Sequence, residues 1–295
     1  MDSGAATILL PVALGIVMLG LGLALTVADF RRVAQEPRAV LVALACQLLL
    51  LPPACLGLVL AFDLSAELAV GMLLLAASPG GTTANLFSHL FRGDVALNIT
   101  LTAVNSVLAI VSLPLVVGLA IGHFDPVGTD GDIGLQFGKV LQVFAIVLVP
   151  VTIGMLVRAR RPAFAIAADR PVRRFSVAVL VIAIIGTAIA EHDRVLDELP
   201  AVGPVALLFC AISLAVGYGV PRLAGVGDRQ AVACAMEIGM HNATIAIAVA
   251  TSVLGSSELA IPAAVYAIAM YPCAAIAGWL VTRGRAEPPA PAAPA

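Results

Sequence analysis

The stretch SPGGTTAN, residues 78–85, interrupts an apolar run that is otherwise long enough to cross a membrane. Proline lacks a backbone donor and glycine weakens a helix, so the predicted span 67–91 is expected to break near its middle. A second stretch, EIGMHNAT at residues 237–244, places polar residues inside the predicted span 229–255. Broken backbone at membrane depth is tolerated only where protein buries it or where it lines a polar cavity. These two stretches therefore predict a polar site inside a membrane protein.

The composition of the whole chain agrees with a membrane location. Hydrophobic residues make up 61% of the 295 residues and charged residues only 12%, with a mean hydropathy of +1.07. Soluble domains carry about 25% charged residues, so this chain lacks the charges to cover a soluble surface. Nucleic-acid binding is excluded because the net charge is −2 and no basic patch occurs outside short loops. The five cysteines lie in apolar runs without a CxxC spacing and are interpreted as small core residues.

Charged residues and Pro/Gly clusters divide the chain into nine predicted transmembrane helices, so the predicted fold class is an all-α polytopic membrane protein. The predicted spans are 5–28, 39–62, 67–91, 95–121, 137–158, 173–190, 201–221, 229–255 and 258–282. Residues 1–286 are predicted to form a single transmembrane unit. The Pro/Ala tail 287–295 has nothing to bury and is expected to be disordered.

The basic residues predict the orientation of these spans. All but two of the sixteen Lys and Arg residues fall on one side, in the loops after spans one, three, five and seven or at the C-terminus; the exceptions are Lys139 and Arg194. Positive loops stay in the cytoplasm, so we expect the N-terminus outside and the C-terminus inside, in the inner (plasma) membrane of a cell. Spans 67–91 and 229–255 then run in opposite directions.

Glu237 is the only acidic residue near the middle of a predicted span, and no Lys or Arg is predicted at that depth. A lone carboxylate there is costly unless it is protonated and hydrogen-bonded, paired or coordinated. Asn98 and Thr102 share one helix face, and Gln47 and Asn85 add further neutral oxygens. One negative charge among neutral oxygens suits a monovalent cation such as Na+. Paired antiparallel broken helices are typical of inverted-repeat transporters, although two glycine kinks can also serve only close packing.

The two stretches, together with Arg92–Gly93–Asp94–Val95–Ala96–Leu97, resemble the bile acid:sodium symporter family, including its bacterial members, over nearly the whole chain. The resemblance implies inverted repeats, with a core domain in which the broken helices 67–91 and 229–255 cross and a panel domain of the remaining peripheral helices. It also implies sodium-coupled import of an organic anion by alternating access, the anion being bile-acid-like or a small carboxylate such as pantoate or pyruvate. No obligate protein partner is indicated.

The resemblance also implies particular site residues. The first sodium site would use the side chains of Asn85, Asn98, Thr102 and Glu237 and the carbonyl of Ala84. The second would use Gln47, Glu237, the carbonyls of Ile238 and Met240, and the side chain of His241. Thr82 and Asn242 match positions that are implied to contact the substrate.

Position 241 departs from the family, in which glutamine is usual. A neutral imidazole offers one nitrogen instead of an amide oxygen, and nitrogen is a poor ligand for sodium. His241 is therefore hypothesised to weaken the second ion site or to substitute a proton for that ion; alternatively it is a hydrogen-bonding replacement that leaves coupling unchanged. The alternative functions are a proton-coupled transporter or a cation/proton antiporter of the same architecture, or a receptor. An enzyme is not expected, because the chain has no GxSxG or HExxH motif.

Overall fold

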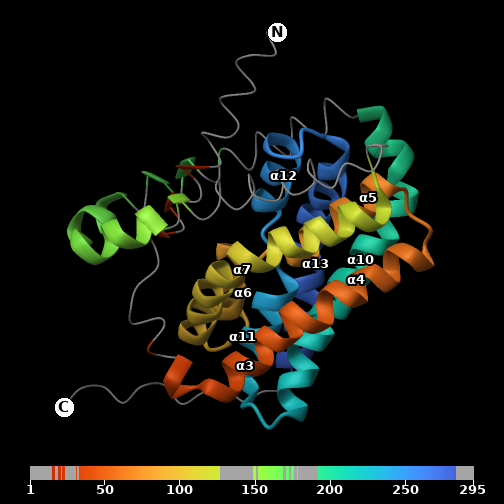
Figure 1. Cartoon of the computed structure of the whole chain (residues 1–295). Coiled ribbons are helices and arrows are strands. Elements are labelled where there is room, and N and C mark those ends of the chain that lie inside the picture. The colour runs from red at the N-terminus through yellow and green to blue at the C-terminus, as the bar shows by residue number, and fades with distance from the viewer. Residues whose placement is uncertain are drawn as a thin grey trace, which may run out of the picture.

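The computed structural model describes residues 15–16, 19–20, 22–23, 31, 33–126, 149–150, 152–168, 171–172, 174–175, 178 and 192–283. These residues are largely helical, and no extended strand occurs among them (Figure 1). Four helices within them are long and apolar enough to cross a membrane: Pro37–Ala61, Val95–Phe124, Asp197–Leu223 and Glu258–Thr282. Most of the predicted spans 5–28, 137–158 and 173–190, and the whole tail 287–295, lie outside the described residues.

The predicted span 39–62 is a single long helix with an irregular centre. It consists of α3 (Pro37–Ala45), the π-helical turn η1 (Cys46–Leu50) and α4 (Leu51–Ala61). The Leu51 N–H donates to the Cys46 carbonyl, five residues back, which is the π-helical pattern. The next two residues, Pro52 and Pro53, have no N–H and so cannot donate the ordinary α-helical hydrogen bonds. This turn contains Gln47, whose side chain is buried and donates to the Ala76 carbonyl in the predicted span 67–91.

Both interrupted spans are broken, as predicted. The first consists of α5 (Ala66–Ala77) and α6 (Thr82–Leu90), and the second of α11 (Asp228–Gly239) and α12 (Ala243–Ser252). In Figure 1, α5 and α12 lie in the upper half of the molecule, whereas α6 and α11 lie in the lower half. Each span therefore crosses the molecule as two half-helices that meet near its centre.

Three further long helices pack around these breaks. They are α7 (Val95–Phe124), α10 (His192–Leu223) and α13 (Ile261–Thr282), the last preceded by the short 3-10 turn η2 (Glu258–Ala260). The predicted span 201–221 lies within α10, which extends toward the N-terminus at least as far as His192. Hydropathy marks where a helix leaves the hydrocarbon, whereas the helix itself continues through the polar residues that follow the membrane boundary.

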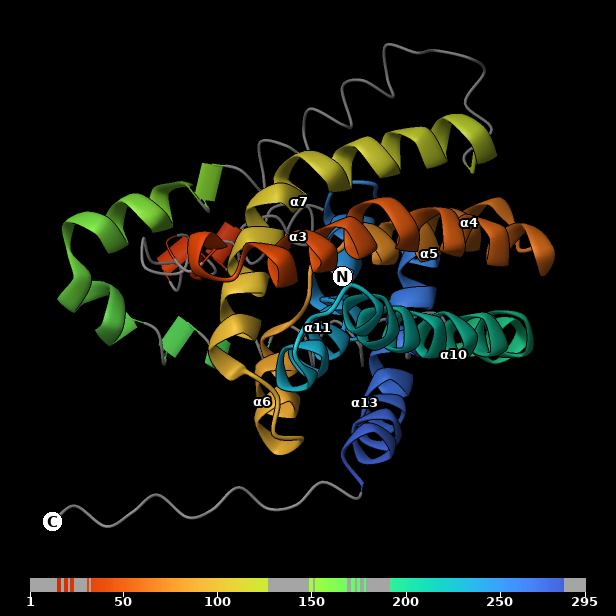
Figure 2. The ribbon, with the colours of Figure 1, turned by 90° about the horizontal axis from the view of Figure 1, so that it is seen from below.

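Small residues allow α10 and α11 to approach each other closely (Figure 2). A Cβ on Gly217 of α10 would lie 2.9 Å from the Ala235 Cα of α11, a distance that real Cβ atoms essentially never show. Such small-residue contacts are a common way to pack helices in membranes. The cysteines also serve the core as predicted: all five are free thiols, and four of them are buried.

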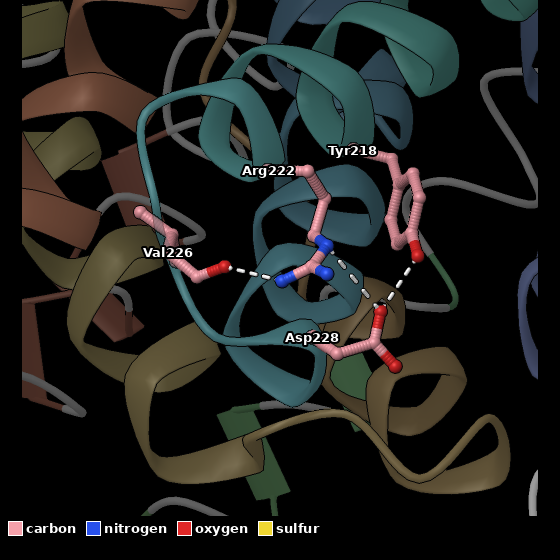
Figure 3. A network of polar contacts seen from close by, with 4 residues as sticks. All are labelled: Tyr218, Arg222, Val226 and Asp228. Atoms are coloured by element: carbon pink, nitrogen blue, oxygen red, sulfur yellow. Dashed lines mark hydrogen bonds and ion pairs between the residues drawn. The ribbon is translucent and has the colours of Figure 1, made fainter.

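A polar network holds the N-terminus of α11, which is the end of the helix farther from the break (Figure 3). The Tyr218 hydroxyl donates to Asp228 Oδ1 over 2.6 Å, and Arg222 Nε lies 3.7 Å from the same oxygen. Arg222 Nη1 also donates to the Val226 carbonyl over 2.8 Å. These contacts fasten the turn between α10 and α11.

The turn between α6 and α7 contacts the same end of α11. The Gly93 N–H donates to the Ser88 carbonyl over 2.7 Å, and the Asp94 N–H donates to the Arg229 carbonyl over 2.9 Å. Asp94 also caps α7 through its Oδ1, which accepts from the Leu97 N–H. The residues Arg92–Gly93–Asp94 therefore connect two neighbouring helices, and α11 is anchored before it reaches the crossing.

Candidate ion and substrate site

The two breaks meet as a short antiparallel bridge between Gly80 and His241. The Gly81 N–H donates to the Met240 carbonyl over 2.9 Å, and the Asn242 N–H donates to the Pro79 carbonyl over 2.8 Å. Each unwound segment thus supplies hydrogen bonds that the other loses by leaving the helix. The carboxyl-terminal ends of α5 and α11 and the amino-terminal ends of α6 and α12 consequently converge at this crossing.

Glu237 lies in the last turn of α11, next to the crossing, with only 2% of its surface exposed. Thr102 Oγ1 lies 2.5 Å from Glu237 Oε2 and 3.0 Å from the Asn98 carbonyl. The hydroxyl has one proton, and an ionised carboxylate is the stronger acceptor, so Thr102 donates to Glu237. Within the described residues Glu237 is the only buried acidic side chain, and no Lys or Arg is buried there. Such a carboxylate needs a cation or a proton to balance it.

Gly80 lies directly against the Glu237 carboxylate. A Cβ at position 80 would overlap Cδ and both carboxylate oxygens of Glu237. The sequence identified this glycine only as a helix breaker, whereas the fold adds a requirement for close approach between backbone and side chain. Asn105, which also lies beside the carboxylate, belongs to the polar face of α7 but is absent from the ligand set that the family resemblance implies.

Three buried oxygens on neighbouring helices have no hydrogen-bond partner within the part of the chain that the structure describes. They are Glu237 Oε1, Asn98 Oδ1 and Asn85 Oδ1. Asn98 is held in place by its Nδ2, which donates to the Ala233 carbonyl one turn before Glu237. Asn85 lies on α6, which packs against α11, and Ala84 is buried beside it in the first turn. Buried polar atoms are normally paired, so these oxygens are free to serve as ligands of a hard cation.

A second polar cluster, which we name the Ser78 cluster, consists of Gln47, Ser78 and His241. Gln47 Nε2 donates to the carbonyls of Ala76 and Ser78, over 3.1 and 3.2 Å. His241 Nδ1 lies 3.1 Å from the same Ser78 carbonyl. A carbonyl can only accept, so Nδ1 carries the proton and Nε2 is the acceptor. Gln47 Oε1 and His241 Nε2 have no partner among the described residues.

Aromatic rings enclose His241. Its ring is fully buried and stacks on Phe209, with ring centroids 5.4 Å apart and planes at 15°. Tyr266 approaches edge-on at 5.5 Å, and its hydroxyl donates to the Gly239 carbonyl over 2.9 Å. Phe209 and Tyr266 come from α10 and α13, and the sequence offers no signal that places them beside residue 241.

Tyr266→Phe is expected to lower the stability of the protein. The Gly239 carbonyl at the end of α11 would lose its hydroxyl donor in a buried site, which costs about 1–3 kcal/mol. Thermal unfolding of the purified protein in detergent measures the effect. Tyr271→Phe, on the same helix at a half-buried position, is the matched control, and an equal loss in both variants would contradict this role for the Tyr266 hydroxyl.

The two predicted substrate residues lie at the starts of the second half-helices. Asn242 is partly exposed and caps α12, its Oδ1 accepting from the Ile245 N–H over 3.3 Å. Thr82 is the first residue of α6, and its side chain lies outside what the structure describes. Gly81, which precedes α6, has no side chain with which to cap the helix. The free N–H groups and the helix dipole at such a terminus favour an anion.

Known proteins of one family are similar to this chain. Residues 11–198 match the Sodium Bile acid symporter family. The chain is 30% identical over 271 residues to the probable sodium/metabolite cotransporter BASS2, chloroplastic, of Oryza sativa subsp. japonica, covering 90% of this chain and 61% of that protein. It is 29% identical over 258 residues to the "uncharacterized sodium-dependent transporter YocS" of Bacillus subtilis (strain 168), covering 86% and 77%.

A human relative extends the comparison. Sodium/bile acid cotransporter 4 of Homo sapiens is 32% identical over 241 residues, covering 80% of this chain and 54% of that protein. The chain thus spans about three fifths of the rice relative and about half of the human one. The resemblance drawn from the two interrupted stretches is confirmed, and the chain belongs to the Sodium Bile acid symporter family.

Proposed function

We propose that this protein is a sodium-coupled secondary active symporter that imports an organic anion by alternating access. The observation that carries the proposal is the set of unpartnered buried oxygens around Glu237, the only buried acid in the described residues. A transition-metal site is not supported, because no group of three His, Cys, Asp or Glu side chains occurs in this part of the chain. The names of the rice, bacterial and human relatives, all of which mention sodium, support the same ion.

Sodium binds at the Glu237 cluster, which we define as Asn85, Asn98, Thr102 and Glu237 with the carbonyl of Ala84. The carboxylate supplies the single negative charge, and the amide and hydroxyl oxygens supply neutral ligands. These groups come from α6, α7 and α11, so a bound ion ties three helices together at the crossing.

The substrate anion binds beside the ion, at the starts of α6 and α12. Thr82 and Asn242 lie at these two helix starts, where backbone N–H groups also converge. With no buried Lys or Arg among the described residues, the anion is held by dipoles and amides. This chemistry accepts carboxylates in general, from bile acids to small metabolites such as pantoate or pyruvate.

The architecture that goes with this function is a nine-helix membrane unit over residues 1–286, built from inverted repeats. The broken spans belong to a core domain, and the remaining peripheral helices form a panel against which the core moves. The N-terminus lies outside the plasma membrane and the C-terminus in the cytoplasm, as the basic loops predict. Sodium shapes the unwound segments, so sodium and anion stabilise each other's binding reciprocally.

The test of this proposal is thermal unfolding of the purified protein in Na+ against K+ or choline at matched ionic strength, followed by a screen of carboxylates in sodium. A ligand that binds only the folded form raises the melting temperature by mass action. A sodium-specific rise, increased further by a carboxylate, supports a sodium symporter. No difference between sodium and choline would refute it.

Thr102→Val is expected to weaken sodium binding about 10- to 150-fold. The variant keeps the side-chain shape but removes the hydroxyl that donates to Glu237, and hydrogen bonds to charged groups contribute about 1.5–3 kcal/mol. The sodium concentration that gives half-maximal stabilisation measures the change. Thr100→Val is the matched control, because the Thr100 hydroxyl donates to the Ala96 carbonyl of its own helix. Equal sodium affinity in wild type and Thr102→Val would remove Thr102 from the ion site.

A further inference from the structure

We infer that the Ser78 cluster does not hold a sodium ion, so that a single sodium, bound at the Glu237 cluster, is coupled to each substrate. The inference rests on the proposed function and specifies its ion count. It concerns the second site that the family resemblance implies, and it follows from how the hydrogen bonds of Gln47, Ser78 and His241 are used.

The only side-chain atom that a neutral His241 can offer to an ion is a nitrogen. Its Nδ1–H points to the Ser78 carbonyl, so the neutral ring presents the lone pair of Nε2. The stack on Phe209 and the edge contact with Tyr266 leave the buried ring little room to turn. Sodium is a hard cation that favours oxygen, whereas imidazole nitrogen suits zinc, copper, iron and nickel.

The carbonyls of this region are also largely engaged within the protein. The Ser78 carbonyl accepts from both Gln47 and His241, and the Gly239 carbonyl accepts from Tyr266. The Met240 carbonyl accepts the Gly81 N–H of the bridge. Of the oxygens implied for the second site, Gln47 Oε1, the Ile238 carbonyl and the second lone pair of the Met240 carbonyl remain for an ion, together with Glu237, which the first site also uses. With His241 offering a nitrogen in place of an oxygen, this set lacks one oxygen ligand.

The two clusters also differ in charge, because only one of them contains a carboxylate. The Ser78 cluster has no carboxylate of its own, whereas Glu237 belongs to the other cluster, in which its Oε2 accepts from Thr102. The Glu237 cluster combines that carboxylate with the unpartnered oxygens of Asn85 and Asn98. The Glu237 cluster is therefore the better sodium site of the two.

The Ser78 cluster instead connects three segments of the protein to one another. Its hydrogen bonds connect the π turn of η1, the end of α5 and the break between α11 and α12. These segments are the ones that a second sodium would otherwise have to hold together. In this chain, hydrogen bonds from the histidine and glutamine side chains connect them without an ion.

The experiment measures how the free energy of unfolding of the full-length protein depends on the logarithm of Na+ concentration, with choline holding the ionic strength constant. At Na+ concentrations well above Kd, each bound ion raises the free energy of unfolding by RT for every unit of the natural logarithm of the concentration. The slope, in units of RT, therefore counts the bound ions. We expect a slope of about 1 for the wild type. His241→Gln restores an amide that donates to the Ser78 carbonyl and presents an oxygen, so its slope is expected to rise to about 2.

The possible outcomes are distinguishable. A wild-type slope of about 2 overturns the single-ion inference but leaves the sodium symporter intact. A slope of zero refutes the proposed function itself. A slope of about 1 in both proteins shows that His241 is not what excludes the second ion, and overturns the assignment to this residue. The wild-type slope answers the main question even if His241→Gln folds poorly, and Tyr271→Phe, a substitution outside both clusters, should keep the wild-type slope.

Discussion

Glu237→Gln is expected to abolish sodium-dependent stabilisation and sodium-driven uptake while the protein still folds. Glutamine keeps the shape and an acceptor oxygen for the Thr102 hydroxyl but removes the one buried negative charge of the described residues. At a sodium concentration of 100 times Kd, the wild type gains about 2.7 kcal/mol from the bound ion, and the variant is expected to lose essentially all of it. Thermal unfolding in sodium and in choline gives this difference directly.

Glu67→Gln is the matched control for this substitution. Glu67 lies in the first turn of α5 and is partly exposed, so its charge has no part in the ion site. The control should keep the full response to sodium. A Glu237→Gln protein that is still stabilised by sodium as strongly as the wild type would show that the carboxylate does not bind the ion.

Gly80→Ala is expected to damage the ion site from the backbone side. The added methyl would overlap the Glu237 carboxylate, so the carboxylate must leave its position beside Thr102 or the bridge to His241 must open. Overpacking of this kind costs about 1–3 kcal/mol. If that cost falls on the ion-bound form, the sodium affinity drops about 5- to 150-fold, and titration of the melting temperature with sodium measures it.

Gly81→Ala separates this steric effect from a general need for glycine in the break. A Cβ at position 81 would lie 3.6 Å from Thr83 Oγ1, an ordinary contact, and the backbone there has φ −91° and ψ 160°, which any residue adopts. The alanine variant at 81 should therefore bind sodium nearly as the wild type does. Equal damage from both substitutions would mean that the overlap with Glu237 is not the cause.

Local chemistry made the breaks and the main polar residues predictable. Pro79 removes a backbone donor and the two following glycines weaken a helix, so this stretch strongly disfavours a continuous helix. Glu237 at membrane depth is costly without a partner, and this cost alone marks it as a functional residue. The spacing of Asn98 and Thr102 places both on one face of a helix, and the fold brings that face against α11.

Other features depend on contacts between distant segments and had no local signal. Residues 192–200 of α10 precede the predicted span 201–221. The enclosure of His241 by Phe209 and Tyr266 joins three separate spans. The approach of Gly80 to Glu237 likewise requires the two breaks to meet, which neither stretch specifies alone.

Hydropathy, proline and charge act over a few residues, so the order of amino acids is enough to define a helical membrane protein with two interrupted spans, one buried carboxylate and the family's motifs. The hydrogen bonds of each polar side chain, in contrast, depend on how the helices pack. Packing leaves oxygens of Asn85, Asn98 and Glu237 unpartnered and directs the Nδ1–H of His241 to the Ser78 carbonyl. A buried polar atom is satisfied by whatever the fold places within about 3 Å of it, and at this site that neighbour comes from another helix.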